Sequence, residues 1–426
     1  MDEKTAASYI RILEKELIPA LGCTEPGALA YAAAKAVQIL GKFPQSMSVN
    51  CSGNIIKNVK GVFVPNSGGL RGVEAAAILG AVIGDPSKEL NVLEQAGEVD
   101  REKTRSLLAA DFCTCTLQEG EDNLYIDISV LAGDESARVI IKNTHTNIVL
   151  IQHNEELLLD KKDEKNTSGT DDKERLNIKD IVAFADQYDI TPLTELLEQQ
   201  IQVNCAIAQA GLDENYGACV GKTLLETEGS SVHVRAKAKA AAGSDARMGG
   251  SCLPVIINSG SGNQGITVTV PVVEYAEELQ LSREKLHRAL VLSNLISIHI
   301  KHYIGNLSAF CGAVSAACGS GAAITYMHGG SLLQISSTIV NTLANVGGIV
   351  CDGAKASCAA KIASALDAAI MAHNMSMRSR GFQAGEGFIT EDIESTIANM
   401  GYIGREGMKT TDIEILKLML KNRICD

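Results

Sequence analysis

Four cysteines in the last third of the sequence have spacings that suggest metal chemistry. Cys311 and Cys318 are seven residues apart in CGAVSAACG, and Cys351 and Cys358 are seven apart in CDGAKASC. Seven residues make two helical turns, so each pair would share a helix face. Thiolates among Gly and Ala suit an iron–sulfur cluster, because small neighbours let backbone N–H groups approach the sulfurs. Cysteine is also among the most buried residue types, and the spacing alone does not separate the two interpretations.

A further cysteine, Cys23, lies in the motif GCTEPGA, directly before an Ala-rich helical pattern. Pro26 suits the first turn of a helix, so Cys23 would stand at the positive end of the helix dipole. That position favours the thiolate, which is the form that acts as a base or nucleophile. Glu25 opposes the shift, and the alternative is a small buried thiol beside an ordinary helix cap.

The segment SGSGNQG at 259–265 is rich in hydrogen-bond donors and could cradle a carboxylate or phosphate. Ser259, Gly260 and Asn263 are its candidate binding residues, and Arg247 in the preceding segment could add a positive charge. The segment matches neither the P-loop nor the dinucleotide-binding fingerprint. A glycine-rich connection between elements remains the alternative.

A second polar segment stands beside a predicted strand, in SGNIIKNVKGVFVP. Asn54, Lys57 and Asn58 could hold the carboxylate or the amine of an amino acid. Otherwise they are turn residues with a solvated lysine.

Two parts of the chain must position these residues. The first, residues 1–155, combines helical patterns with short alternating or apolar runs that indicate strands. A Gly-Asp pair at 133–134 favours a tight hairpin. The helical patterns cover 5–20, 26–41, 72–84 and 98–110, a strand, loop and strand occupy 46–65, and the other strand-like runs are 113–118, 123–132, 136–143 and 146–153.

The second part is predicted to be helical almost throughout, from 176 to 426, with one strand-like run at 266–273. Between the two parts, residues 154–175 hold eight acidic and five basic side chains, which is typical of a solvated linker or loop. The sequence therefore predicts an α+β fold. An N-terminal α/β unit with an antiparallel sheet is joined to a larger, mostly α-helical C-terminal domain.

Composition excludes several classes of function. The chain has 426 residues and a formal net charge of −13, which argues against a nucleic-acid surface. Its first residues lack a secretory signal, so the twelve cysteines are expected to be reduced in a cytoplasmic protein. The uncharged run 308–326 is mostly Gly, Ala and Ser, which favours a buried helix over a membrane span.

The motifs taken together resemble the archaeal L-cysteine desulfidase family and its bacterial relatives. The segments that carry the resemblance are GCTEP, NIIKNVKGVFVP, SGSGNQG, CGAVSAACG and CDGAKASC, and it extends to GREGMKTTDIEIL at 404–416. It thus covers nearly the whole chain. More distantly, the C-terminal half resembles the α chain of iron–sulfur L-serine dehydratases.

The resemblance implies an oxygen-sensitive [4Fe–4S] cluster held by three cysteines, which by position are Cys311, Cys351 and Cys358. The open iron would act as a Lewis acid on the leaving group, and Cys23 would remove the α-proton. The implied reaction is the α,β-elimination of L-cysteine to pyruvate, ammonia and sulfide. The Cys351–Cys358 spacing resembles the desulfidase pattern more than that of the serine dehydratases.

Three other readings stay open at this point. The same cluster could serve a serine or threonine dehydratase, and a non-catalytic iron–sulfur redox sensor belongs to another class. A pyridoxal phosphate enzyme would use SGSGNQG as its phosphate cup, and we expect no such cofactor. The expected ligand is a small amino acid, without nucleic acid or membrane, and the uncharged small-residue helices are compatible with a homodimer.

Overall fold

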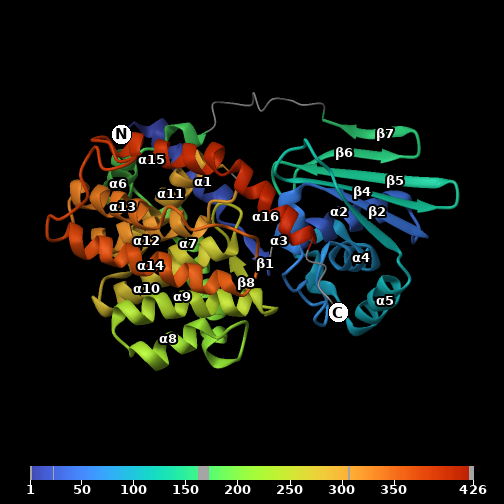
Figure 1. Cartoon of the computed structure of the whole chain (residues 1–426), viewed down its shortest axis with the longest axis horizontal. Helices are drawn as coiled ribbons and strands as arrows, with labels where there is room; N and C mark the ends of the chain where they lie inside the picture. The colour runs from blue at the N-terminus through green and yellow to red at the C-terminus, as the bar shows by residue number, and fades with distance from the viewer. Residues whose placement is uncertain (1, 23, 162–171, 306–307, 422–426) are drawn as a thin grey trace.

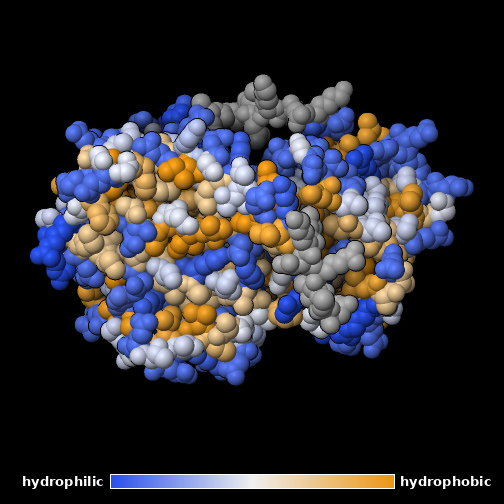
Figure 2. All heavy atoms as spheres, in the orientation of Figure 1, coloured by the Kyte–Doolittle hydropathy of each residue, from blue (hydrophilic) through white to orange (hydrophobic). Residues whose placement is uncertain are grey.

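The computed structural model describes residues 2–22, 24–161, 172–305 and 308–421, and it consists of two parts that lie side by side (Figure 1). One part carries a six-stranded sheet with helices, and the other is built from packed helices. This arrangement confirms the predicted α+β class. In the space-filling view the two parts are lobes that meet along a furrow at the lower edge (Figure 2).

The sheet has the strand order β3-β2-β4-β5-β6-β7. Only the β2–β3 pair is parallel, and the other neighbours are antiparallel. The predicted hairpin at 133–134 joins β4 to β5, where Gly133 takes a positive φ of 65°. The strands are β2 (Ser46–Cys51), β3 (Cys113–Leu117), β4 (Tyr125–Ala132), β5 (Glu135–Lys142), β6 (Ile148–His153) and β7 (Glu156–Asp160).

Four helices accompany the sheet, and two of them pack unusually closely. They are α2 (Thr24–Leu40), α3 (Gly53–Val59), α4 (Val73–Ile83) and α5 (Glu98–Ala109), and a 3-10 segment at Pro86–Gln95 lies between α4 and α5. A Cβ atom at Gly80 of α4 would lie 2.2 Å from the carbonyl oxygen of Ala30 in α2. The abundance of Gly and Ala in this chain therefore allows helix backbones to approach one another.

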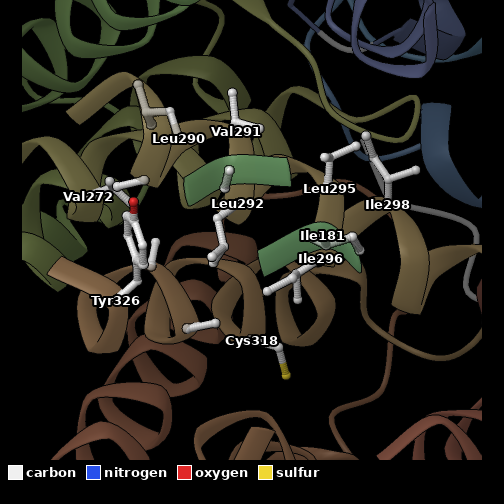
Figure 3. Close-up of a cluster of buried hydrophobic side chains, with 14 of the residues drawn as sticks. Ile181, Val272, Leu290, Val291, Leu292, Leu295, Ile296, Ile298, Cys318 and Tyr326 are labelled. Atoms are coloured by element: carbon white, nitrogen blue, oxygen red, sulfur yellow. The ribbon is translucent and has the colours of Figure 1, made fainter. Parts of the chain in front are cut away.

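The helical part is centred on α11 and α12, whose side chains are buried on nearly every face (Figure 3). A Cβ at Gly319 of α12 would lie 2.3 Å from the Ser293 carbonyl of α11, so these two helices also pack backbone to backbone. The helices of this part are α6 (Ile178–Gln187), α7 (Thr194–Asp213), α8 (Val220–Glu228), α9 (Val232–Met248), α10 (Gly262–Glu278), α11 (Arg283–Ile304), α12 (Gly312–Met327), α13 (Leu332–Val346), α14 (Ser357–Ser376) and α15 (Ile393–Tyr402).

Both ends of the chain tie the two parts together. Helix α1 (Glu3–Glu16) buries Tyr9 and Leu13 in the core of the helical part. Strand β1 (Pro19–Leu21) then pairs with β8 (Pro254–Ile256) before the chain enters α2. At the other end, α16 (Lys409–Lys421) returns to contact α3 (Gly53–Val59) of the sheet part.

Two local predictions were wrong. Residues 266–273, predicted as a strand, lie inside α10, whose side chains are buried on almost all sides. A short β-branched run cannot be told from a buried helix by its pattern, and tertiary packing outweighs its weak propensity. The segment predicted as strand, loop and strand over 46–65 does begin with β2, but it continues as α3.

The charged segment 154–175 is only partly described. Residues 156–160 form β7 at the edge of the sheet, and 172–175 form a short 3-10 helix. Residues 162–171 lie outside the described residues. The run 308–326 falls mainly in α12, which is buried along its whole length. No helix among the described residues has the length and apolarity that crossing a bilayer requires.

Candidate functional site

A cavity of about 490 Å³ gathers the predicted site residues that the structure describes. Its walls come from both parts of the molecule, including α2 and α3 on one side and the N-terminal ends of α10, α12 and α14 on the other. Cys23 lies outside the described residues, and Thr24 beside it in the sequence lines the cavity. The predicted residues in the walls are Asn54, Lys57, Asn58, Arg247, Ser259, Gly260, Asn263, Cys311, Cys351 and Cys358.

Cys311 and Cys351 stand on two loops that run side by side. Cys311 immediately precedes α12, and its N–H donates to the Ile349 carbonyl at 3.0 Å. The N–H of Cys351 donates to the Ala309 carbonyl at 2.6 Å, and Phe310 and Val350 pair as an antiparallel bridge. These backbone bonds bring the Cys311 and Cys351 thiols into hydrogen-bond contact.

The two thiols have opposite pKa shifts. The hydrogen bond from Cys311 lowers the pKa of Cys351 despite burial, and the positive charges of Lys57 and Lys301 act in the same direction. The hydrogen bond to Cys351 raises the pKa of Cys311, and burial raises it further. These shifts favour the thiolate at Cys351 over Cys311, and the thiolate is the form of cysteine that binds metals.

Cys358 is the third thiol of this wall, in the first turn of α14. Its Sγ donates to the Gly353 carbonyl at 3.7 Å, and burial raises its pKa. In the part of the chain that is described, no three His, Cys, Asp or Glu side chains form a preassembled metal cage. The donor set still fits an iron–sulfur cluster, because three thiols share one cavity wall beside two lysine ammonium groups.

Cys318 does not belong to this wall. Cys311 precedes α12 as its N-cap, while Cys318 lies inside the helix, fully buried in the core of the helical part (Figure 3). Burial strongly raises the pKa of its thiol. The seven-residue spacing therefore does not place Cys311 and Cys318 together, because only one of them lies on regular helix.

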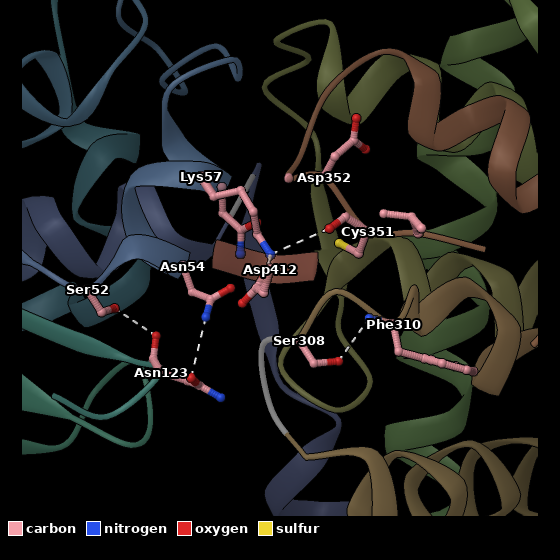
Figure 4. Close-up of polar contacts among 12 residues, drawn as sticks. Ser52, Asn54, Lys57, Asn123, Ser308, Phe310, Cys351, Asp352 and Asp412 are labelled. Carbon is pink, nitrogen blue, oxygen red and sulfur yellow. Dashed lines mark hydrogen bonds and ion pairs between the residues drawn. The ribbon is translucent and has the colours of Figure 1, made fainter. Parts of the chain in front are cut away.

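Lys57 joins the sheet part to the cysteine loops (Figure 4). Its side chain is 2% exposed, and its ammonium forms an ion pair with Asp412 of α16. The same ammonium donates to the Cys351 carbonyl at 3.5 Å. Gly353 follows closely, with a φ of +94°, and a Cβ there would lie 2.2 Å from the Lys57 carbonyl. Only glycine lets the cysteine loop pass α3 at this distance.

Lys301 of α11 is a further cation in the cavity wall, and sequence reasoning did not identify it. Burial lowers its pKa, and the nearby Cys351 and Cys311 act in the opposite direction. No carboxylate among the described residues pairs with it at salt-bridge distance. It occupies an unremarkable position in a helical sequence, so no local motif marks it.

Arg247 lies beside the N-terminal end of α10. Its side chain is buried, its Nε donates to the Gly22 carbonyl at 2.9 Å, and no described carboxylate pairs with it. A Cβ at Gly262 would lie 2.5 Å from that Nε, so glycine makes room for the guanidinium. Asn263 Oδ1 and Gln264 Oε1 are buried there without hydrogen-bond partners. Guanidinium and helix N-terminus together can bind an anion such as a carboxylate.

The remaining predicted residues have mostly local partners. The Ser259 hydroxyl donates to Asn258 Oδ1 at 3.0 Å, so it serves the loop before α10. Gly260 has a φ of +76°, and its carbonyl accepts a hydrogen bond from Thr24 at 3.1 Å. Asn54 Nδ2 donates to Asn123 at 3.4 Å, while its Oδ1 is buried without a partner (Figure 4).

Another part of the cavity wall carries a carboxylate, and sequence reasoning identified only some of its residues. Glu25 of α2 accepts hydrogen bonds from Asn58 Nδ2 at 2.9 Å and from the Thr24 hydroxyl at 3.1 Å. His145, on the loop between β5 and β6, lies with Nε2 4.0 Å from Glu25 Oε1. We call Glu25, Asn58 and His145 the acidic corner. His145 stands alone in the sequence, so only the fold reveals its place.

Comparisons with known proteins place the chain in a family. The family model of the serine dehydratase alpha chain matches residues 87–417. A UPF0597 protein of Lachnoclostridium phytofermentans is 50% identical over 411 residues, covering 96% of this chain and 99% of that protein. A UPF0597 protein of Desulfitobacterium hafniense is 49% identical over 414 residues, covering 97% and 96%. The chain belongs to the serine dehydratase alpha chain family.

Proposed function

We propose that this protein is a lyase that catalyses the α,β-elimination of a small β-substituted L-amino acid, with L-cysteine as its substrate. The observation that carries the proposal is one cavity whose walls hold three cysteines and the buried Arg247. Family membership supports dehydratase-type elimination chemistry in general. The choice of L-cysteine rests on the resemblance of GCTEP and CDGAKASC to the cysteine desulfidases.

Cys311, Cys351 and Cys358 would hold a [4Fe–4S] cluster, and their shared wall supports this assignment. When bound, the cluster supplies a Lewis-acidic iron with an open position for the leaving group. Lys57 and Lys301 favour the thiolate of Cys351 and so prepare one ligand for metal. No pyridoxal phosphate is needed for this chemistry.

The substrate carboxylate would bind to Arg247 and the first N–H groups of α10. Both are buried at the cavity wall, and no described carboxylate neutralises Arg247. Lys57 is the weaker candidate, because Asp412 already pairs with its ammonium. A charge-assisted carboxylate–guanidinium contact also fixes the orientation of the α-carbon.

Cys23 would remove the α-proton, as the resemblance implies. The C–H electron pair becomes the Cα–Cβ double bond as the C–S bond breaks, and sulfur leaves with that bond's electron pair. The resulting aminoacrylate tautomerises and hydrolyses to pyruvate and ammonia. The test is Cys23→Ala, which should abolish turnover while iron remains bound. Unchanged turnover in this variant would contradict the role.

The experiment that tests the function is anaerobic reconstitution with iron and sulfide. Iron and acid-labile sulfide are measured, and L-cysteine, L-serine and D-cysteine are then assayed side by side. We expect bound iron in the wild type, its loss in Cys351→Ala, and its retention in the matched control Cys318→Ala. Protein without iron, carrying a borohydride-trapped cofactor on a lysine, would refute the proposal.

L-Serine dehydration is the second candidate, because the matching family model describes serine dehydratase alpha chains. The two substrates share the carboxylate and amino group, and they differ in the leaving group. Sulfide release from L-cysteine at a higher kcat/KM than pyruvate formation from L-serine supports the first candidate. The reverse order would establish the second.

A further inference from the structure

The acidic corner contains two acceptor atoms with an unusual separation. Glu25 Oε1 and His145 Nε2 are 4.0 Å apart, which is too far for a hydrogen bond between them. His145 Nε2 is buried and has no hydrogen-bond partner, although a buried polar atom normally has one. One nitrogen atom that carries two or more N–H groups could lie about 2.9 Å from both atoms at once, because that is the usual length of an N–H hydrogen bond.

The backbone around His145 holds the ring in place. The Lys142 N–H donates to the Asn147 carbonyl at 3.1 Å, and Asn147 Nδ2 donates back to the Lys142 carbonyl at 3.0 Å. These bonds close the loop that carries His145. Its ring packs against Gly260, where a Cβ would lie 3.5 Å from Cε1. The acceptor on His145 is therefore fixed relative to the helical part.

Glu25 is equally well fixed. Asn58 Nδ2 donates to its Oε1 at 2.9 Å, and the Thr24 hydroxyl donates to its Oε2 at 3.1 Å. Its side chain is only 8% exposed. A carboxylate with such restricted access to water binds a cation much more strongly than a solvated one.

Residues 22–25 link the acidic corner, through Glu25, to the anion-binding residues around Arg247 and the start of α10. Gly22 accepts the hydrogen bond from Arg247, and Thr24 bonds to the Gly260 carbonyl. Glu25 and the N-terminal end of α10 are thus held next to each other with opposite charge. An α-amino acid carries its ammonium and its carboxylate on one carbon, so it matches this arrangement.

We infer that Glu25 and His145 form the subsite for the α-ammonium group of the substrate. Two of its N–H groups would donate to Glu25 Oε1 and to His145 Nε2, which accepts a hydrogen bond when the imidazole proton is on Nδ1. Because a hydroxyl in place of the ammonium loses the ion pair and one donor, the subsite selects amino acids over 2-hydroxy acids. This inference rests on the proposed function and names the group that decides its substrate class.

The test measures the binding of two probes to the full-length protein by calorimetry. L-Alanine carries the ammonium group and L-lactate replaces it by a hydroxyl, and neither has a leaving group. The wild type should prefer L-alanine by about tenfold or more, as expected when a buried polar site loses its partner. Glu25→Gln should remove most of that preference by weakening L-alanine alone.

His145→Leu keeps a side chain of similar bulk and removes the acceptor, so it should also weaken L-alanine selectively. It carries the test if Glu25→Gln does not fold. Glu16→Gln is the matched control, because Glu16 is another carboxylate of the cavity lining and already pairs with Lys173. The control should leave the preference for L-alanine unchanged.

Equal affinity of the wild type for both probes would overturn the inference. So would variants of Glu25 and His145 that weaken both probes alike. The probes separate this failure from failure of the proposed function. Preference for L-alanine without turnover of L-cysteine or L-serine leaves the subsite standing and refutes the elimination. Turnover with an unchanged preference in Glu25→Gln refutes the subsite alone.

Discussion

Arg247 is a guanidinium that folding has buried without a carboxylate partner in the described part of the chain. A charge in such a place is costly unless a ligand or a set of dipoles compensates it. Arg247 lies beside the N-terminal end of α10, whose positive dipole adds to its charge instead of offsetting it, so an anionic ligand is the missing partner. At the scale of single residues, this is the clearest sign of a binding site.

Arg247→Lys tests that role. Lysine keeps the charge but lacks the planar fork that holds a carboxylate at two points. We expect KM for the amino-acid substrate to rise about tenfold, with a smaller change in kcat. Arg235→Lys on the same helix should leave KM unchanged, because Arg235 pairs with Glu274 and Glu278 away from the cavity. Equal KM values for all three proteins would argue against the contact.

His373 is a buried histidine outside the site, and it predicts how stability depends on pH. Burial, followed by the charge of His328, lowers its pKa from 6.5 to about 4. Between those two values the unfolded chain binds a proton that the folded protein excludes. The folded state therefore loses stability as the pH falls through this window, by about 2 kcal/mol between pH 7 and pH 5.

Denaturant unfolding of the wild type and His373→Gln at pH 7 and pH 5 measures this effect. The amide can still bond to the Thr325 hydroxyl, which now lies 3.0 Å from His373 Nδ1. We expect the variant to lose less stability on acidification than the wild type. Identical changes in the two proteins would show that His373 is protonated in the folded state.

At the scale of elements, the site depends on loops that precede helices. Cys311 and Cys351 meet because short backbone pairing joins the segments before α12 and α14. Cys358 joins them from the first turn of α14. Side chains at helix starts are positioned by the helix packing behind them, so buried helices without chemistry still fix the geometry of the thiols.

Gly353→Ala tests this dependence. Its φ of +94° and the Lys57 carbonyl 2.2 Å from the added Cβ leave no room for a side chain. We expect a loss of about 2 kcal/mol or more in unfolding free energy, together with lower iron content after reconstitution. Gly348→Ala is the control, because a Cβ there meets nothing within 4 Å. Equal iron content in both variants would contradict the prediction.

At the scale of the whole molecule, the chain crosses between its two parts near both ends. Helix α1 and strand β1 belong to the helical part by packing and pairing, although α2 and the sheet follow them in sequence. The cavity lies where these crossings meet, with walls from both parts. Formation of the cavity therefore requires both parts to be folded and in contact.

A fragment of residues 172–426 tests the crossing directly. It lacks Tyr9 and Leu13 of α1 and the strand that pairs with β8, so apolar core surface is exposed. We expect it to unfold without cooperativity, as followed by circular dichroism in urea. Joining residues 2–22 to it through a flexible linker should restore a cooperative transition. A cooperative transition in the bare fragment would contradict this expectation.

The local sequence pattern was enough to predict some of the strands and several polar residues that line the cavity. Strands β4, β5 and β6 alternate or carry turn signals, and they appear where predicted. The run 266–273 was mispredicted because a helix buried on every face has no amphipathic period. His145 and Lys301 carry no motif, and their places in the cavity arise from elements distant in sequence.

The sequence by itself determined the α+β class and the motif residues that line the cavity, because these follow from residue type and short spacing. Only the tertiary structure decided which residues meet. It separated Cys318 from Cys311, paired Lys57 with Asp412 and brought His145 to Glu25. Contacts between residues more than a hundred positions apart depend on how helices and strands pack, and no local pattern encodes that packing.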